Sequence, residues 1–151
     1  MPTPSKSRKK GSRRNMKVLL DTNVILDVLT KREPHFEHSA AFLRLCGTRL
    51  TGCVAASQTT DIFYVLRREG VEARAAVDLL KKLTDNVKVV DTNAADVQAA
   101  LASDMPDYED ALLACCAKRQ RATCIVTRNE KDFKQSPVRA ISPQAFLEQT
   151  L

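Results

Sequence analysis

The sequence predicts an α/β fold, a three-layer sandwich in which helices cover both faces of a central, mostly parallel sheet. Short apolar stretches rich in β-branched residues alternate along the chain with longer amphipathic stretches, and this alternation is typical of βαβ units. Right-handed crossovers between the strands place helices on both faces. With 151 residues, of which 44% are hydrophobic, the chain is long enough for one domain with a buried core.

The first half of the chain contains two predicted strands, each followed by two predicted helices, in the order 17–21, 23–30, 35–46, 50–54, 57–70 and 71–84. The strands are short apolar runs. Gly47 is expected to cap the end of the second helix. Ser57 is expected to cap the start of the third, which ends at Gly70, because a serine hydroxyl accepts hydrogen bonds from free backbone N–H groups.

The second half of the chain repeats the alternation, with strands and helices expected in the order 87–90, 93–103, 108–120, 122–127, 138–141 and 142–149. Asp107 is expected to cap the helix that begins at 108. Residues 128–134 are expected to form a polar loop. Ser142 and Pro143 fit the cap and the first position of the last helix, where proline is favoured.

The positive charge of the chain is confined to its start. Residues 1–15 carry six basic side chains and no acidic one, whereas residues 16–151 carry 18 of each sign. We expect 1–15 to be a disordered basic tail and 16–151 to form a single domain. The tail is interpreted as a segment that follows nucleic-acid phosphates. The alternatives are an extension without function, a vector-derived leader, or a true translation start at Met16.

Composition also bears on the compartment. No apolar run reaches the roughly 18 residues that a membrane span needs, and no apolar segment follows the N-terminal charges as in a secretory signal. The five cysteines have no paired spacing, which argues against a disulfide framework. Cys115 and Cys116 are expected to pack as small hydrophobic side chains. We therefore expect a cytoplasmic protein with no membrane partner.

Acidic residues recur where strands give way to helices. The carboxyl ends of parallel strands, and the helix starts beyond them, lie at one edge of such a sheet. Four groups of residues are expected at this edge: Asp21, then Asp61, then Asp107 with Glu109 and Asp110, and then Asn129 with Glu130 and Asp132. Carboxylates gathered in this way repel one another unless a cation holds them.

The residue types indicate which cation and which chemistry. Oxygen ligands without histidine or cysteine favour Mg²⁺ or Mn²⁺. Such a metal polarises a phosphate and lowers the pKa of a bound water, so the cluster indicates phosphoryl or phosphodiester chemistry. His35 and His38 are expected on the second helix, facing solvent or a partner.

Each acid also has a structural interpretation that stays open. Asp21 is placed to cap the helix after the first strand. Asp61, about one turn into its helix, favourably meets the helix dipole. Asp107 is a helix cap that pairs with Asp110. Asp132 also fits an ordinary loop acid, and Asp27, near the end of the first helix, is interpreted as a structural or supporting residue.

Other motifs are excluded. The four glycines are scattered, so neither a P-loop nor a dinucleotide-binding loop is present. Asn23 stands where a phosphatase of the haloacid dehalogenase type has its second aspartate. No cysteine or histidine spacing indicates zinc.

Four segments of the sequence resemble PIN-domain ribonucleases, the fold of VapC-type toxins. These segments are 18–27, 57–64, 107–114 and 125–133. They come in the family's order and lie within about residues 16–141. The resemblance implies an α/β/α sandwich, RNA cleavage that depends on Mg²⁺ or Mn²⁺, frequent homodimers, and a small antitoxin that inserts a basic side chain into the acidic pocket.

The resemblance also assigns residues. The family's acids correspond to Asp21, Asp61 and Asp110, and Thr127 matches a hydroxyl often found beside the metal. The sequence departs from the pattern twice: Asp61 stands where glutamate is more usual, and Asn129 stands where the family often has a fourth aspartate.

We therefore predict a metal-dependent endoribonuclease whose catalytic, metal-binding residues are Asp21, Asp61 and Asp110. Asn129 and Asp132 are predicted as secondary metal ligands. Supporting roles are predicted for Asp107, Thr127 and Asn23, and contacts to the RNA backbone for Arg128 and Lys131. The alternative is a PIN-like module that binds RNA or a protein without cutting, which Asn129 favours.

Overall fold

The structure is a computed structural model that describes residues 16–150, so the prediction of a disordered tail at 1–15 lies outside the described residues. These residues form one five-stranded sheet with the order β3-β2-β1-β4-β5, in which all neighbouring strands are parallel. The strands are β1 (Lys17–Leu20), β2 (Thr51–Ala55), β3 (Lys88–Val90), β4 (Cys124–Val126) and β5 (Ala140–Ile141).

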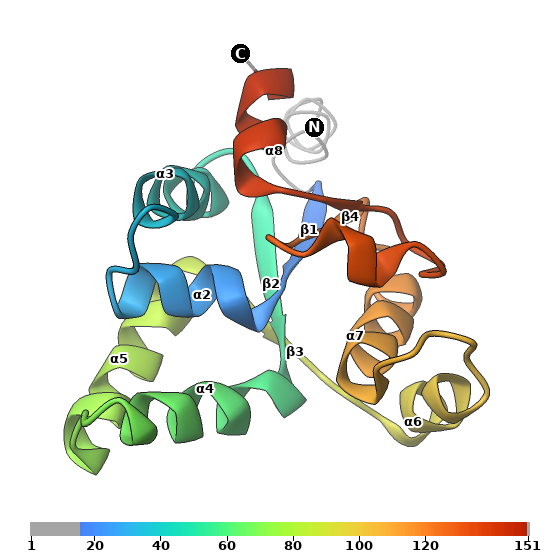
Figure 1. The fold of residues 1–151 in the computed structure, drawn as a ribbon, viewed down its shortest axis with the longest axis horizontal. Helices are drawn as coiled ribbons and strands as arrows, with labels where there is room; N and C mark the ends of the chain where they lie inside the picture. The colour runs from blue at the N-terminus through green and yellow to red at the C-terminus, as the bar shows by residue number, and fades with distance from the viewer. Residues whose placement is uncertain (1–15, 151) are drawn as a thin grey trace, which may run out of the picture.

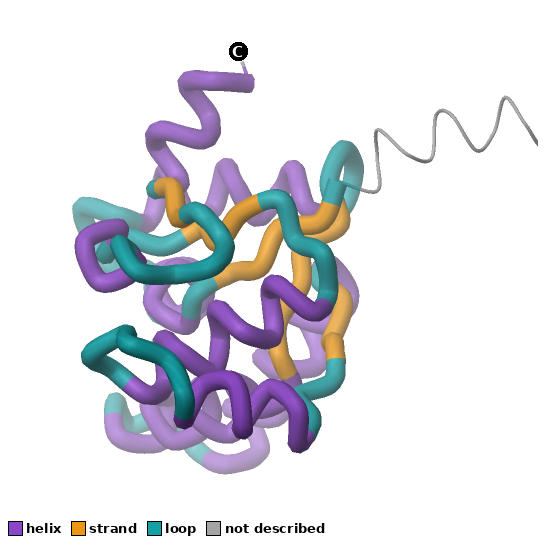
Figure 2. Tube along the Cα trace, turned by 90° about the vertical axis from the view of Figure 1, so that its right-hand side faces the viewer, coloured by secondary structure: helices purple, strands orange, loops and turns teal. Residues whose placement is uncertain are grey.

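Helices cover both faces of the sheet, which confirms the predicted three-layer fold. In Figure 1, α2 to α5 lie on the left of the sheet and α6 and α7 on its right, and Figure 2 looks onto the α6–α7 side. The helices are α2 (Thr22–Leu29), α3 (Phe36–Cys46), α4 (Ala56–Arg68), α5 (Ala73–Asn86), α6 (Ala94–Leu101), α7 (Tyr108–Arg119) and α8 (Pro143–Thr150). Helix α8 is joined to α3 by an edge-to-face contact of Phe42 and Phe146, with ring centroids 5.1 Å apart.

The strand residues alternate between two apolar cores, one on each face of the sheet. In β1, Val18 and Leu20 belong to the core shared with α2–α5 and α8, whereas Leu19 belongs to the core shared with α6 and α7. All three side chains are fully buried. Because side chains along a strand point to alternate faces, a continuous apolar run is what a doubly covered strand requires.

The chain reverses its direction of winding next to β1. It first adds β2 and β3 on one side of β1, and then returns to add β4 and β5 on the other. With right-handed crossovers, this reversal moves the connecting helices from one face to the other. A crevice forms beyond the carboxyl ends of the two strands at such a switch point, here β1 and β4, and the candidate site lies there.

One segment differs from its predicted form. Residues Glu130–Phe133 form a short 3₁₀ helix, η1, within the predicted polar loop 128–134. The backbone N–H of Asp132 donates to the carbonyl of Asn129 at 3.0 Å, and Phe133 is buried in the α6–α7 core. A single turn held by one apolar residue is too short to give a periodic signal in the sequence.

All five cysteines are free, and four of them are buried. Burial raises the pKa of the Cys46 thiol to about 12, so this thiol stays protonated at neutral pH. Cys116 is fully buried in the α6–α7 core, against which the partly buried Cys115 packs, as predicted for small hydrophobic side chains. Within residues 16–150, no helix has the length and apolar character to cross a membrane.

Gly52 in β2 is expected to be sensitive to substitution. A Cβ added at Gly52 would lie 2.5 Å from Cys46 Sγ and 2.7 Å from Cys46 Cβ, inside van der Waals contact. We expect Gly52→Ala to lower the free energy of unfolding by about 1–3 kcal/mol through overpacking, measured by urea denaturation. Gly47→Ala is the matched control, because its nearest neighbour would be at 3.4 Å, and a Gly47→Ala loss as large as that of Gly52→Ala would contradict this account.

Candidate active site

Asp21 occupies the switch point between β1 and β4. Its backbone N–H donates to the carbonyl of Val126 at 2.9 Å. Its Oδ1 accepts from the Thr22 N–H at 2.7 Å, so Asp21 is the N-cap of α2. Its Oδ2 accepts from the Thr127 hydroxyl at 2.7 Å. The capping role and a role in the site are therefore compatible, because one oxygen caps the helix and the other is held by the end of β4.

Helix α4 begins at Ala56, so the prediction that Ser57 caps this helix was wrong. The N-cap position is Ala55, and its N–H donates to Oε1 of Gln58 at 2.7 Å. The Gln58 amide also donates to the Leu20 carbonyl at 2.8 Å, which joins α4 to the end of β1. Asp61 is consequently in the second turn of α4, beyond the free N–H groups of the helix start.

Helix α7 presents the next acids. Asp107 is the N-cap, and its Oδ1 accepts from the Asp110 N–H at 3.0 Å, as the sequence predicted. Glu109 and Asp110 then lie in the first turn of the helix. Acidic side chains at this position are favoured by the helix dipole, so local structure alone permits this cluster.

The structure brings the three predicted metal ligands to one small pocket. The pocket has a volume of about 80 Å³ and joins the start of α2, the first turns of α4 and the start of α7. Its polar lining includes Asp21, Gln58, Asp61, Glu109 and Asp110. Residues from three separate parts of the chain thus meet beside the end of β1.

The carboxyl groups of this pocket perturb one another. Burial, followed by the charges of Asp21 and Asp107, raises the pKa of Asp110 to about 7. Burial also raises the pKa of Asp21, against the opposing hydrogen bonds from Thr127 and Thr22. The pKa of Glu109 is raised by burial and by the charge of Asp61. The pocket therefore disfavours full ionisation of its acids unless a cation is present.

This shift predicts a pH dependence of stability for the metal-free protein. A carboxyl group with a higher pKa in the folded chain binds more protons when folded, so stability falls as pH rises between the two pKa values. For Asp110 the window runs from 3.8 to about 7. We expect the melting temperature in EDTA to fall over this window more for the wild type than for Asp110→Asn, measured by circular dichroism. Melting temperatures that change with pH in the same way in the two proteins would contradict the raised pKa of Asp110.

Asn129, Asp132 and Lys131 lie beside the acidic pocket and line a neighbouring depression on η1. The charge of Asp132 contributes to the raised pKa of both Asp21 and Asp110, so it acts on the pocket electrostatically. The N–H of Asn129 donates to Thr127 Oγ1 at 3.0 Å. Their roles as metal ligands, and that of Lys131 toward RNA, stay predictions.

Arg128 is engaged in a buried ion pair. Its Nε donates to Asp27 Oδ2 at 2.6 Å and its Nη2 to Asp27 Oδ1 at 3.2 Å, and Asp27 is fully buried. Ser39 also donates to Asp27, at 3.3 Å, and the Arg128 N–H lies 3.4 Å from Asn23 Oδ1. This arrangement gives Asp27 the structural role expected of it, and it gives Arg128 a structural role besides the predicted RNA contact.

Glu109 and Gln58 are among the residues of the pocket that the sequence prediction missed. Glu109 was noted with its acidic neighbours but was not selected, although it lines the pocket beside Asp110. Its position in the first turn of α7 was the available signal. Gln58 gave no signal of its own, because its role depends on hydrogen bonds to residues about 38 positions away in the chain.

The donor atoms fit a hydrated divalent cation better than a dehydrated one. Among residues 16–150, no three histidine, cysteine, aspartate or glutamate side chains lie close enough together to hold a metal ion. Mg²⁺ keeps several of its waters and binds through one or two carboxylates. Four acidic side chains line the pocket, with no basic side chain of the described residues beside them in the lining, and this suits a cation bound partly through water.

The comparisons with known proteins agree with the fold described above. A family profile described as PIN domain matches residues 17–131. Ribonuclease VapC1 of Aquifex aeolicus (strain VF5) is 23% identical over 138 residues, covering 87% of this chain and 94% of the relative.

Solved structures show the same fold. VapBC2 from Rickettsia felis, bound to a DNA fragment from its promoter, has a TM-score of 0.68 at 18% identity and covers 84% of this chain and 98% of that one. A toxin-antitoxin complex from Klebsiella pneumoniae has a TM-score of 0.62 at 18% identity, covering 83% and 97%. Because the family profile matches most of the chain, and in agreement with the resemblance seen in the sequence, this chain belongs to the PIN domain family.

Proposed function

We propose that this protein is an endoribonuclease that hydrolyses RNA phosphodiester bonds with Mg²⁺ or Mn²⁺. The proposal rests on the acidic pocket, where Asp21, Asp61 and Asp110 line one cavity and the pKa of Asp110 is raised to about 7. Membership of the PIN domain family and a ribonuclease among its relatives support RNA as the substrate.

The residues of the pocket have distinct proposed roles. When bound, Mg²⁺ or Mn²⁺ would polarise the phosphate and lower the pKa of an attacking water. Asp21 is held in position by Thr22 and Thr127, and each of its oxygens keeps a lone pair for a further ligand. Asp110, whose pKa is raised to about 7, would be partly protonated at neutral pH, and a bound cation would favour its ionised form because metal ligands must be deprotonated.

The proposal extends to partners and compartment. A small antitoxin protein would place a basic side chain in the acidic pocket, and relatives solved as toxin-antitoxin complexes support such a partner. A homodimer is proposed on family resemblance. A reducing, cytoplasmic setting is supported by five free cysteines, because disulfides are rare in such a compartment.

Removal of metal tests the proposal directly. We expect the protein to cut a single-stranded RNA at internal positions in Mg²⁺ or Mn²⁺, and excess EDTA to stop the reaction because it removes the cation that activates water. Products are resolved on a denaturing gel, and readdition of Mg²⁺ is expected to restore cleavage. Cleavage that persists in EDTA would refute the metal dependence.

Two observations favour a second candidate function. Asn129 stands where the family often has a fourth aspartate, and within residues 16–150 no three acidic side chains lie close enough together to hold a metal ion. In this alternative the protein binds RNA or a protein partner without cutting. Calorimetric titration separates the two candidates. Heat of binding at millimolar or lower Mg²⁺ or Mn²⁺ supports the nuclease, whereas no binding together with no cleavage supports the binding module.

A further inference from the structure

A second cavity, of about 340 Å³, lies beside the acidic pocket and has a different chemistry. It lies between the start of α3, the residues that follow β4, and the start of α8. Its polar side chains are His35, His38, Ser39, Arg128, Asn129, Ser142 and Gln144. Among the described residues, no carboxylate lines it, whereas the neighbouring pocket contains Asp21, Asp61, Glu109 and Asp110.

The ion pair at the edge of this cavity is oriented with its positive end outward. Asp27 is fully buried, whereas the Arg128 side chain is 24% exposed. Two N–H groups of the guanidinium bind Asp27, and the structure gives the others no hydrogen-bond partner within residues 16–150. A guanidinium has five N–H donors, so Arg128 can bind a second oxyanion without releasing Asp27.

The helices that border the cavity add partial positive charge. α3 and α8 both begin there, and the N-terminal end of a helix dipole is positive. His35, at the N-cap position of α3, makes no capping hydrogen bond with its side chain, whereas the N–H of Phe36, the first residue of the helix, donates to the Arg32 carbonyl at 2.7 Å. The Ser142 hydroxyl accepts from the Ala145 N–H at 3.1 Å at the start of α8.

The cavity is connected to the acidic pocket through a short chain of hydrogen bonds. Asn129 lines the cavity, and its N–H donates to Thr127 Oγ1 at 3.0 Å. Thr127 Oγ1 in turn donates to Asp21 Oδ2 at 2.7 Å. A strand of RNA whose phosphate lies at Asp21 would therefore bring a nearby phosphate to the cavity.

We propose that this cavity is a phosphate subsite that holds the RNA backbone next to the cleaved bond, through Arg128, His38 and the amide of Gln144. The inference rests on the proposed ribonuclease function and adds the contact that positions the substrate. The acidic pocket repels an RNA strand, and phosphate contacts fix the position of a nucleic acid on a protein without reading its sequence. The neutral and basic lining of the cavity supplies such contacts.

Two matched glutamate variants test the subsite. Gln144→Glu places a negative charge at the cavity, whereas Gln149→Glu makes the same change at an exposed position of the same helix that does not line it. Both are made in an Asp21→Asn background, so the RNA stays intact. We expect Gln144→Glu to weaken binding of a single-stranded RNA about tenfold by like-charge repulsion, and Gln149→Glu to change it less than about twofold, measured by fluorescence anisotropy.

A second measurement identifies the bound group. Inorganic phosphate is expected to shift the NMR signals of the His35 and His38 rings, and Gln144→Glu is expected to reduce these shifts. Equal RNA affinity of the two glutamate variants would overturn the subsite, even if the wild type cuts RNA in Mg²⁺ and the proposed function stands. The phosphate subsite would also be overturned if a poly-glutamate peptide displaced the labelled RNA at a lower concentration than unlabelled RNA does. That result would favour an acidic protein partner.

Discussion

We expect Asp21→Asn to lower RNA cleavage by at least about a hundredfold, because even residues that only support a metal ligand cost about 10- to 100-fold in affinity or activity when they are lost. The substitution removes the negative charge that a cation needs and keeps the side-chain oxygen that caps α2 at 2.7 Å from the Thr22 N–H. Because asparagine is as good a helix cap as aspartate, the fold is expected to survive. Initial cleavage rates in Mg²⁺ measure the effect.

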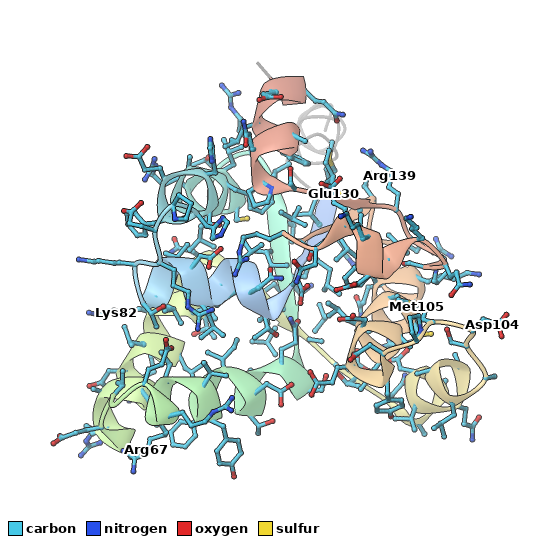
Figure 3. The ribbon with its side chains drawn as sticks, in the orientation of Figure 1. Arg67, Lys82, Asp104, Met105, Glu130 and Arg139 are labelled. Atoms are coloured by element: carbon cyan, nitrogen blue, oxygen red, sulfur yellow. The ribbon has the colours of Figure 1, made fainter. Side chains whose placement is uncertain are left out.

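Asp104→Asn is the matched control for this substitution. Asp104 is an exposed acid in the loop before α7, and Figure 3 shows it pointing outward at the edge of the molecule, away from the sheet. We expect the Asp104→Asn protein to cleave RNA at the wild-type rate. An Asp21→Asn protein that is folded and cuts at the wild-type rate would refute the assignment of Asp21.

We expect Arg128→Met to lower the free energy of unfolding by about 3–5 kcal/mol, the usual cost of leaving one partner of a buried ion pair alone. The remaining Asp27 carboxylate is fully buried, and its one other side-chain hydrogen bond among the described residues comes from Ser39 at 3.3 Å. Urea denaturation measures the loss.

The double variant Asp27→Asn with Arg128→Met checks the cause of this loss. Since it removes the uncompensated charge, we expect it to be more stable than Arg128→Met alone. Arg32→Met breaks the exposed pair with Glu69, whose side chains are 33% and 40% exposed, and is expected to cost less than about 1 kcal/mol. A double variant no more stable than Arg128→Met would contradict the ion-pair account.

The fold followed from the sequence because its signals are local and repeated. Each strand is a short apolar run, and helix starts such as Asp107 and Asn93 carry their own capping side chains. Where the cap comes from a residue inside the helix, as with Gln58 in α4, the predicted start at Ser57 was wrong. Boundaries elsewhere moved by a few residues, which is the usual uncertainty of helix and strand ends.

The site was predicted only in part. Local sequence patterns mark some of its residues, whereas contacts between distant parts of the chain place the others. Asp21, Asp61 and Asp110 follow from the edge of the sheet and from the family's motifs, and the structure brings them to one cavity. The pairing of Arg128 with Asp27 joins residues 101 positions apart. No local pattern encodes such a contact, so the sequence presented Arg128 only as a free basic residue near the site.

A crystal of the protein soaked in Mn²⁺ and measured at the manganese absorption edge tests the central claim most directly. Anomalous scattering counts the bound metals and names their ligands. The account predicts a peak in the pocket formed by Asp21, Asp61 and Asp110, with some of these ligands bound through water. No peak in this pocket at millimolar Mn²⁺, or a peak bound only by Asn129 and Asp132, would contradict it.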